Sequence, residues 1–375
     1  MSLAAPGSYA RPSSTPPREA PVAARGLAVQ LRRLFGGPLT SVATVILAVI
    51  ALGLGYQIVM WGLVHAVWYA PGDGAACRDA AGACWAVVPE KYRVMLFGSY
   101  PYDEHWRGAL IVAIWIVWAV LSASRLVPSR AKILGWLALF AGSIVLMKGG
   151  VFGLSPVGTD LWGGLPLTFL IFGGTVAGGL PLAILLALGR RSQLPAVRWL
   201  SILTIDVVRG IPLLVVLFFA ALILPLFTPD WMNVDKLIRA EVGMIVFFAA
   251  YAAEVVRGGL QAVPAGQDEA ARALGIGYWL RMRKVVLPQA MAISTPALFN
   301  DIIRAFKNTT FFSILGLFDV LGATKTALQD PNWVRYGMEG YIFVFALYFV
   351  ICSALAAYGR SIERQANARK RRAER

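Results

Sequence analysis

The chain has 375 residues, of which 58 % are hydrophobic and only 15 % are charged, and its mean hydropathy is +0.65. This composition is too apolar for an ordinary soluble globular protein. The formal net charge of +15 does not indicate nucleic-acid binding, because the basic residues lie next to apolar stretches rather than on one soluble face. The composition therefore predicts an all-α membrane protein.

Eight apolar stretches are long enough to be considered as membrane spans, which take about 20 mostly apolar residues each. They cover approximately residues 41–64, 109–127, 133–148, 165–189, 202–227, 242–257, 291–308 and 341–358. Three are weaker than the others: 133–148 is short, 242–257 carries Glu254, and 291–308 carries three charged residues. We expect about eight transmembrane helices.

The first forty residues are rich in Pro, Ser, Ala and Arg and have no compact apolar core near Met1. This pattern predicts a disordered cytoplasmic tail rather than a cleavable signal peptide. If the N-terminus is cytoplasmic and each stretch crosses the membrane once, most of the 35 Lys and Arg residues fall on the cytoplasmic side, as the positive-inside rule requires. Both termini, including a basic tail over 361–375, are then cytoplasmic.

A long external loop over 65–107 follows the first span, and it contains Cys77 and Cys84. In an oxidising compartment the two form a disulfide; otherwise they are two unpaired thiols. Gly, Pro and Asp residues interrupt the apolar pattern again at 149–164. We therefore divide the chain into an accessory three-span region over 41–150 and a five-span core over 165–360.

The glycine-rich run over 173–179 lies inside a predicted span and is not a phosphate-binding loop. Gly174 and Gly178 are four residues apart on one helix face. Small residues at that spacing let two helix backbones approach closely in a membrane. The run predicts helix packing.

The most informative segment is a polar cytoplasmic loop over 258–290. Pro264 and Gly266 precede acidic residues near 268, which is typical of a helix start, and Gly275 supplies a helix stop. The loop therefore predicts a short helix with a sharp exit, outside the membrane. Its spacing is specific: three residues separate a Glu-Ala-Ala triplet from Gly275, and nine more precede Val285. The residues of the pattern are Glu269, Ala270, Ala271, Gly275, Leu287 and Pro288.

This pattern resembles the coupling loop in the membrane subunits of ATP-binding-cassette (ABC) importers, with Val285 in place of the usual Ile. The resemblance implies a five-helix type I importer core and a short helix that docks in a groove of a separate ATPase subunit. Glu269 then faces basic residues of the ATPase, Ala270 and Ala271 permit close approach, and Gly275 allows the turn.

Further blocks resemble the polar-amino-acid branch of these permeases, the histidine and glutamine type. They cover 165–190, 207–214, 252–267, 287–290 and 306–311, the last with a small departure at Asn308. The resemblance implies L-amino acids as substrates and a bacterial inner membrane. It also implies three kinds of partner: ABC ATPase subunits, a second homologous permease subunit or a second copy of this chain, and a periplasmic amino-acid-binding protein. No cofactor is implied.

Ionisable residues within the spans are candidates for the substrate pathway, because charges in lipid are costly unless they line a cavity or find a partner. A zwitterionic amino acid needs both a cationic and an anionic contact. Asp206 and Arg209 are candidates, but their spacing also fits a simple pair along one helix face. Glu254 and Arg257 repeat that spacing as a helix-end pair. Asp301, Arg304 and Lys307 share one face of the seventh stretch.

Other classes of protein fit less well. The segment from Gly322 to Thr326 lacks the first glycine of a phosphate loop, so we expect no ATPase site in this chain. No Ser, His and Asp constellation indicates an enzyme, and His65, His105 and the cysteines lack metal-ligand spacing. An ion-coupled secondary transporter for amino acids is the alternative, although such a carrier would not need the pattern from Glu269 to Pro288.

Overall fold

The computed structural model describes residues 34–72, 74–124, 127–229 and 234–373, so the predicted tail over 1–40 lies almost entirely outside the described residues. The described chain is helical, and within it the only β-type pairings are isolated bridges from Val67 to Cys84 and from Gly164 to Asp319. The predicted all-α fold class is confirmed. The chain forms two compact units, residues 1–66 and 67–375.

The first unit contains α2 (Pro38–Val59), which continues into the π-helical turn η1 (Met60–Val64). Pro38 occupies the first turn, where its missing N–H costs nothing, and the Gly37 N–H donates to Thr40 Oγ1 at 3.0 Å. The helix is apolar on all sides and carries no charged residue. An isolated helix of this kind has the composition of a membrane span.

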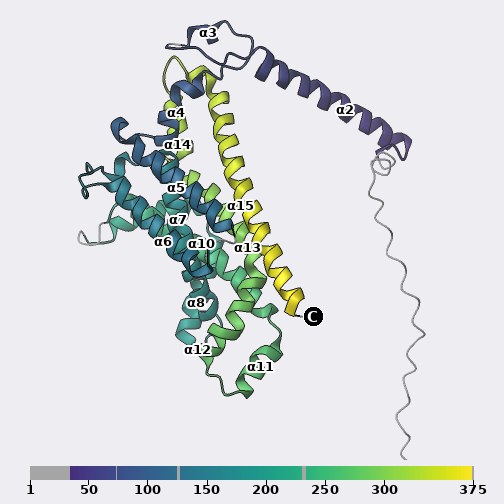
Figure 1. The fold of residues 1–375 in the computed structure, drawn as a ribbon, viewed down its shortest axis with the longest axis vertical. Coiled ribbons are helices and arrows are strands. Elements are labelled where there is room, and N and C mark those ends of the chain that lie inside the picture. The colour runs from purple at the N-terminus through teal and green to yellow at the C-terminus, as the bar shows by residue number, and fades with distance from the viewer. Residues whose placement is uncertain (1–33, 73, 125–126, 230–233, 374–375) are drawn as a thin grey trace, which may run out of the picture. The chain divides into compact units, whose positions relative to one another are not determined.

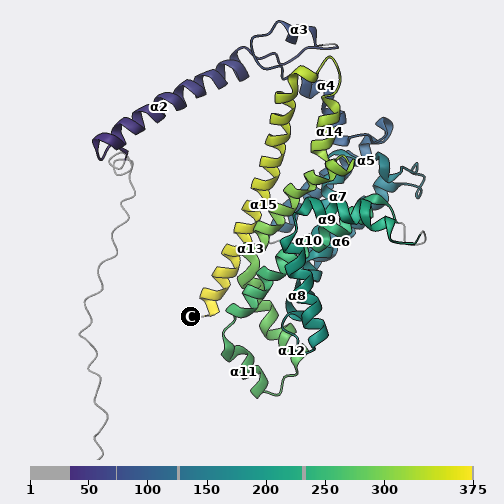
Figure 2. The same ribbon diagram turned by 180° about the vertical axis from the view of Figure 1, so that it is seen from behind.

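The second unit contains the remaining helices, which are labelled in Figures 1 and 2. The α-helices are α3 (Ala75–Arg78), α4 (Val87–Phe97), α5 (His105–Ala123), α6 (Ser129–Lys148), α7 (Gly164–Gly189), α8 (Pro195–Gly210), α9 (Leu213–Phe218), α10 (Lys236–Ala262), α11 (Ala265–Ala273), α12 (Tyr278–Arg281), α13 (Leu287–Asn308), α14 (Val320–Ala327) and α15 (Gly337–Ala373). Short 3-10 or π turns are η2 (Tyr102–Glu104), η3 (Thr159–Leu161), η4 (Phe219–Ile223), η5 (Leu224–Leu226), η7 (Met282–Val286), η8 (Thr309–Leu315) and η9 (Val334–Tyr336). In both views α4 and α14 lie at one end of this unit and α11 and α12 at the other.

Six helical segments among the described residues are long and apolar enough to cross a membrane. They are Pro38–Val64, Tyr102–Ala123, Ala131–Lys148, Gly164–Gly189, Lys236–Ala262 and Val334–Arg364. The expected span over 202–227 is not one continuous helix, because α8 and the helical segment Leu213–Leu226 form an angle of 112° across the break at Ile211 and Pro212. Proline has no N–H to donate and forces the preceding residue out of the helical region. If the bent pair is one span, the count reaches seven, and the predicted eight was approximate.

α13 covers the expected span over 291–308, but its charged residues keep it below the hydropathy of the other six. It packs against α10 and α15 within the bundle. Of its charged residues, Asp301 is buried and pairs with Arg304, whereas Lys307 is exposed.

The centre of the bundle is the contact between α7 and α10. As predicted, glycines of the 173–179 run lie in this contact: a Cβ atom on Gly178 would be 2.9 Å from Ile245, and one on Gly174 would be 2.6 Å from Glu241. Gly179 also faces α10, where a Cβ atom would be 2.4 Å from the Phe248 ring. Small residues on α7 therefore let the two helices approach closely.

A second, smaller core fastens the loop before α5 to the end of the bundle. Cys77 and Cys84 form a disulfide, and with Met95 they pack against Leu328 and Trp333. We name this region, with α3, α4 and α14, the disulfide end. Residues from Val67 onward belong to one compact unit, and the division into an accessory region over 41–150 and a core over 165–360 stays a prediction.

Two polar contacts reinforce the disulfide end. The Cys84 N–H donates to Glu339 Oε1 of α15 at 2.8 Å. Lys91 Nζ of α4 donates to Asp330 Oδ2 at 2.6 Å, and this hydrogen bond holds the pKa of the Asp330 carboxyl below its usual range. The segment from α3 to α4 is thus bound to both α14 and α15.

We predict that replacing both Cys77 and Cys84 with Ala lowers the stability of the folded chain. Closing a loop of this length removes unfolded-state entropy equivalent to about 2.5 kcal/mol, so the melting temperature in detergent should fall by several degrees. Cys352, which is unpaired in α15, provides the control as Cys352→Ala. Equal melting temperatures for the double variant and the control would show that the disulfide does not stabilise the disulfide end.

Candidate functional site: the α11 loop and the α10–α13 pocket

The predicted short helix of the cytoplasmic loop is α11 (Ala265–Ala273), which starts after Pro264. It ends in a Schellman motif: the Gly275 N–H donates to the Arg272 carbonyl at 2.8 Å and the Ile276 N–H to the Ala271 carbonyl at 3.1 Å. Gly275 has φ +72°, a left-handed conformation that residues other than glycine rarely adopt. A Cβ atom at this position would nevertheless meet nothing within 4 Å. The turn therefore needs glycine for its backbone and not for space.

The loop exposes an unusual mixture of side chains. Glu269 and Ala270 are exposed, whereas Ala271 is buried. Leu274 and Trp279 are 79 % and 76 % exposed at the end of the bundle away from the disulfide end. Large apolar side chains next to an acidic residue on a protruding loop are typical of a protein-binding surface.

Ion pairs tie α11 to the helix that follows it. Asp268 Oδ1 lies 2.5 Å from Arg281 Nε, and Asp268 Oδ2 lies 2.9 Å from an Arg272 nitrogen. The Arg281 side chain is almost completely buried and also donates to the Ile276 carbonyl at 3.3 Å. Sequence reasoning singled out Glu269 and missed Asp268 and Arg281. The i, i+4 spacing of Asp268 and Arg272 was a usable signal; the pairing with Arg281 depends on the fold of the loop.

The loop leads directly into α13. After α12, the π turn η7 brings the chain to Leu287 and Pro288, the first two residues of α13. Gln289 of α13 donates to the Val285 carbonyl at 2.9 Å and to Gln267 Oε1 of α11 at 3.4 Å. A displacement of α11 therefore acts on the start of α13 through both side-chain and backbone contacts.

Three arginines surround Glu254 where α7, α8 and α10 meet. Arg257 pairs with Glu254 on α10, as predicted, and nitrogens of Arg190 and Arg209 lie 3.7 and 3.8 Å from Glu254 Oε2. The spacing suggested that Asp206 pairs with Arg209 along α8. Instead Asp206 Oδ1 lies 3.1 Å from Arg190, which ends α7, because Arg209 reaches across to α10.

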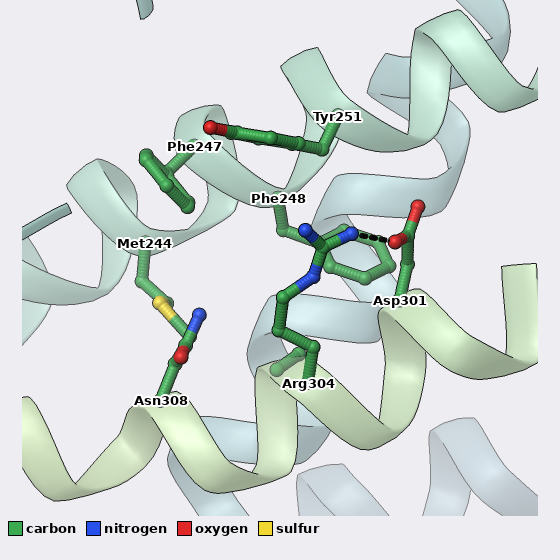
Figure 3. A pocket seen from close by; sticks show the side chains of 8 residues that line it. Met244, Phe247, Phe248, Tyr251, Asp301, Arg304 and Asn308 are labelled. Carbon is green, nitrogen blue, oxygen red and sulfur yellow. Dashed lines mark hydrogen bonds and ion pairs between the residues drawn. The ribbon is translucent and has the colours of Figure 1, made fainter. Parts of the chain in front are cut away.

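A pocket between α10 and α13 brings together some of the candidate residues (Figure 3). It is a small hollow with room for about one water molecule, and it is lined by Met244, Phe247, Phe248, Tyr251, Asp301, Arg304, Ala305 and Asn308. Asp206, Arg209 and Lys307 do not line it, and Lys307 is exposed on a different part of α13. The aromatic side chains and Asn308 were not predicted, because the contact between α10 and α13 is not visible in local sequence.

Asp301 and Arg304 provide both charges of the pocket. The Asp301 side chain is 5 % exposed; its Oδ1 pairs with Arg304, and its Oδ2 has no hydrogen-bond partner in the described structure. The Arg304 guanidinium lies 4.9 Å from the centre of the Tyr251 ring, and that of Arg209 lies 5.5 Å from the same ring. A buried carboxylate oxygen without a donor is costly unless a ligand or water completes it. Among the described residues no group of three or more His, Cys, Asp or Glu side chains is arranged to hold a metal ion.

Comparison with known proteins identifies the family. The family described as "Binding-protein-dependent transport system inner membrane component" matches residues 179–365, which include the α11 loop and the pocket. The "Inner membrane amino-acid ABC transporter permease protein YhdY" of Escherichia coli (strain K12) is 43 % identical over 309 residues, covering 82 % of this chain and 84 % of that protein. This chain belongs to the binding-protein-dependent permease family.

A second member of the family is similar over nearly its whole length. The "Glutamate/glutamine/aspartate/asparagine transport system permease protein BztC" of Rhodobacter capsulatus is 34 % identical over 96 % of this chain and 98 % of that protein. Among solved structures, that of an amino acid ABC transporter with histidines has a TM-score of 0.48 at 26 % identity, covering 64 % of this chain and all of that chain. As a family member, this chain is a multi-pass inner-membrane permease.

We predict that Arg281→Gln loosens the α11 loop. Without the guanidinium, the loop loses the ion pair with Asp268 and the hydrogen bond to the Ile276 carbonyl, and a hydrogen bond from a charged group contributes about 1.5–3 kcal/mol. Amide hydrogen exchange over 265–276 should therefore accelerate by roughly tenfold or more. Arg283 lies two residues away and is exposed, which makes Arg283→Gln the matched control. Equal exchange rates in the two variants would mean that Arg281 does not hold the loop.

Proposed function

We propose that this chain is a membrane subunit of an ATP-driven importer and that it moves L-amino acids across the inner membrane. The carrying observation is α11, an exposed helix that ends in a left-handed Gly275 and presents Glu269, Leu274 and Trp279 at one end of the bundle. The similar proteins named above are amino-acid permeases, which supports the substrate class. In this proposal a separate ATPase subunit hydrolyses ATP.

In the proposed mechanism the ATPase subunit binds α11. Glu269 faces basic groups of that partner, and Ala270 presents no bulk that would keep the two surfaces apart. Closure of the ATPase subunits on ATP displaces α11, and the pair from Asp268 to Arg281 carries the displacement to α12. Gln289 then transmits it to α13, which bears Asp301 and Arg304. This gives a mechanical connection from ATP to the pocket.

We propose further that the pocket binds the amino acid during passage. The unpartnered Oδ2 of Asp301 offers an acceptor for the ammonium group, and the Arg304 guanidinium offers donors for the carboxylate. Tyr251 and Phe248 supply apolar surface around these charges. Of the five residues proposed for the pathway, Asp301 and Arg304 contact the amino acid in this proposal. Lys307, Asp206 and Arg209 do not.

The proposed topology has both termini in the cytoplasm. The basic residues that flank the spans support this orientation through the positive-inside rule. A disulfide between Cys77 and Cys84 fits the oxidising side of an inner membrane, and α11 lies at the opposite end of the bundle. The complete transporter in this proposal has a second permease subunit, either a homologue or another copy of this chain, two ATPase subunits and a soluble amino-acid-binding protein.

The first experiment is affinity purification of the tagged chain from membranes. We expect an ABC ATPase and a second permease to copurify, and we expect deletion of 269–275 to remove the ATPase. A chain that purifies alone and transports amino acids into proteoliposomes without ATP would instead establish an ion-coupled carrier.

We predict that Gly275→Val uncouples ATP hydrolysis from uptake. A β-branched residue at φ +72° strains the turn by about 1–3 kcal/mol, so uptake should fall roughly tenfold while ATP hydrolysis continues. Glu269→Lys should have the same effect by reversing the charge that faces the ATPase. Gly277 has φ −60° and equally open surroundings, so Gly277→Val is the control and should transport normally. Normal uptake in the Gly275 and Glu269 variants would refute the coupling role.

We predict that Asp301→Asn lowers amino-acid uptake by about tenfold, because a neutral amide attracts an ammonium group less than a carboxylate does. Lys307→Gln removes a charge from the same helix outside the pocket and should have little effect. Uptake of radiolabelled amino acid by the reconstituted transporter measures both. Equal uptake by the two variants would show that Asp301 does not contact the substrate.

A further inference from the structure

The loop that joins α6 to α7 begins with a hairpin over residues 149–157, which we name the 149–157 hairpin. The Val157 N–H donates to the Lys148 carbonyl at 2.8 Å, and the Gly150 N–H donates to the Leu154 carbonyl at 2.9 Å. At its tip, Phe152 has φ 54° and is 92 % exposed. Among the described residues, Phe152 is the only residue other than glycine with a positive φ.

This placement of a phenylalanine is unfavourable twice over. A left-handed backbone costs a side-chain-bearing residue roughly 1–2 kcal/mol, and glycine would avoid that cost. Gly150 and Gly153, on either side, adopt φ 79° and 75°. The large apolar ring is also left in contact with solvent. Backbone strain at a residue with a large exposed apolar side chain indicates a binding role, because binding a partner covers that side chain.

The hairpin is held rigidly by its neighbours. Arg107 of α5, whose side chain is 1 % exposed, donates to the Ser155 carbonyl at 2.8 Å and to Ser155 Oγ at 2.9 Å. Any Cβ atom on Gly149 would collide with the Ser155 carbonyl. Beyond the hairpin, Thr159 donates to Asp235, which caps α10. A tip fixed in this way presents Phe152 without an ordering cost on binding.

The hairpin lies on the side of the disulfide end. The Tyr100 hydroxyl, which follows α4, donates to the Met147 carbonyl at 3.0 Å, one residue before the end of α6. The α11 loop lies at the opposite end of the same unit. A partner that reaches Phe152 is therefore on the external side of the membrane under the proposed topology, where a disulfide persists.

We propose that the 149–157 hairpin is a docking point for the soluble amino-acid-binding protein, with Phe152 inserted into the surface of that protein. This rests on the proposed function and its topology. The family to which the chain belongs is binding-protein-dependent, and the hairpin lies before the residues that the family matches, so this contact would be an addition to the shared core. A fixed, exposed aromatic ring is the kind of anchor that contributes most to protein–protein affinity.

Insertion of the ring into lipid is the competing arrangement, and the base of the hairpin opposes it. Glu104 and Arg107 pair at 2.8 Å beside Ser155, and Lys148, whose carbonyl accepts from the Val157 N–H, ends α6. Charged groups of this density mark the bilayer surface rather than the hydrocarbon. The tip of the hairpin, which carries Phe152, follows α6 in the chain and lies beyond this charged base.

The test uses the complete transporter in lipid nanodiscs, with ATP hydrolysis measured against the concentration of its amino-acid-loaded binding protein. Phe152→Asn keeps a residue that tolerates the left-handed backbone and removes the ring. We expect the half-maximal concentration of binding protein to rise roughly tenfold, with unchanged hydrolysis in its absence and at saturation. Tyr69 is 76 % exposed on the same side, so Tyr69→Asn is the matched control and should not shift the curve.

A photoreactive benzoylphenylalanine at position 152 supplies an independent readout and should crosslink to the binding protein. Crosslinks to lipid alone, an unshifted curve for Phe152→Asn, or an equal shift for Tyr69→Asn would each overturn the docking proposal while leaving the importer intact. Absence of any stimulation of the unaltered transporter by binding protein would overturn the proposed function itself, and the docking point with it.

Discussion

The close approach of α7 and α10 is the contact on which the rest of the bundle depends. No lipid-driven hydrophobic effect holds helices together inside a bilayer, so packing of small residues and internal polar contacts must do so. Glycines on α7 lie against Ile245 and Glu241 of α10, and a methyl group at Gly174 or Gly178 would require the ends of those side chains to move. Because α10 also packs against α8 and α13, its position relative to α7 fixes the geometry of both polar regions in the bundle.

Those two polar regions differ in how well their charges are satisfied. Glu254 has three arginines around it, so its charge is compensated and its role is to hold α7, α8 and α10 together. Each carboxylate has one buried oxygen without a hydrogen-bond partner, but Glu254 Oε2 lies 3.7 and 3.8 Å from two arginines, whereas the one arginine of Asp301 pairs with its other oxygen, Oδ1. An unsatisfied buried acceptor costs free energy that a structural pair does not. This difference, rather than the presence of charge, separates the candidate binding site from the ion-pair network.

The sequence could predict a feature where its signal lies within a few neighbouring residues, but not where the feature depends on contacts between distant segments. The start of α11, its end at Gly275 and the break at Pro212 all have signals within a few residues, although the break was overlooked as the apolar stretch 202–227 runs through it. The pocket combines α10 with α13, and the pairing of Asp206 with Arg190 crosses from α8 to α7. No single-sequence pattern determines which helices meet. The contact between Arg107 and Ser155, which holds the base of the 149–157 hairpin, joins residues 48 apart in the chain and is equally invisible locally.

The distribution of rigid and deformable elements explains how a pull at one end can act on the middle of the bundle. At the disulfide end, α14 and the start of α15 are fixed by the Cys77–Cys84 segment and by Lys91. At the other end, α11 has few contacts besides those that lead through Arg281 and Gln289 to α13. The π turn η7 lies between them, and its extra residue makes it the easiest part of that connection to rewind. In the proposed mechanism, a force on α11 would therefore be opposed at the far end of the bundle and would displace α13, the helix that carries Asp301 and Arg304.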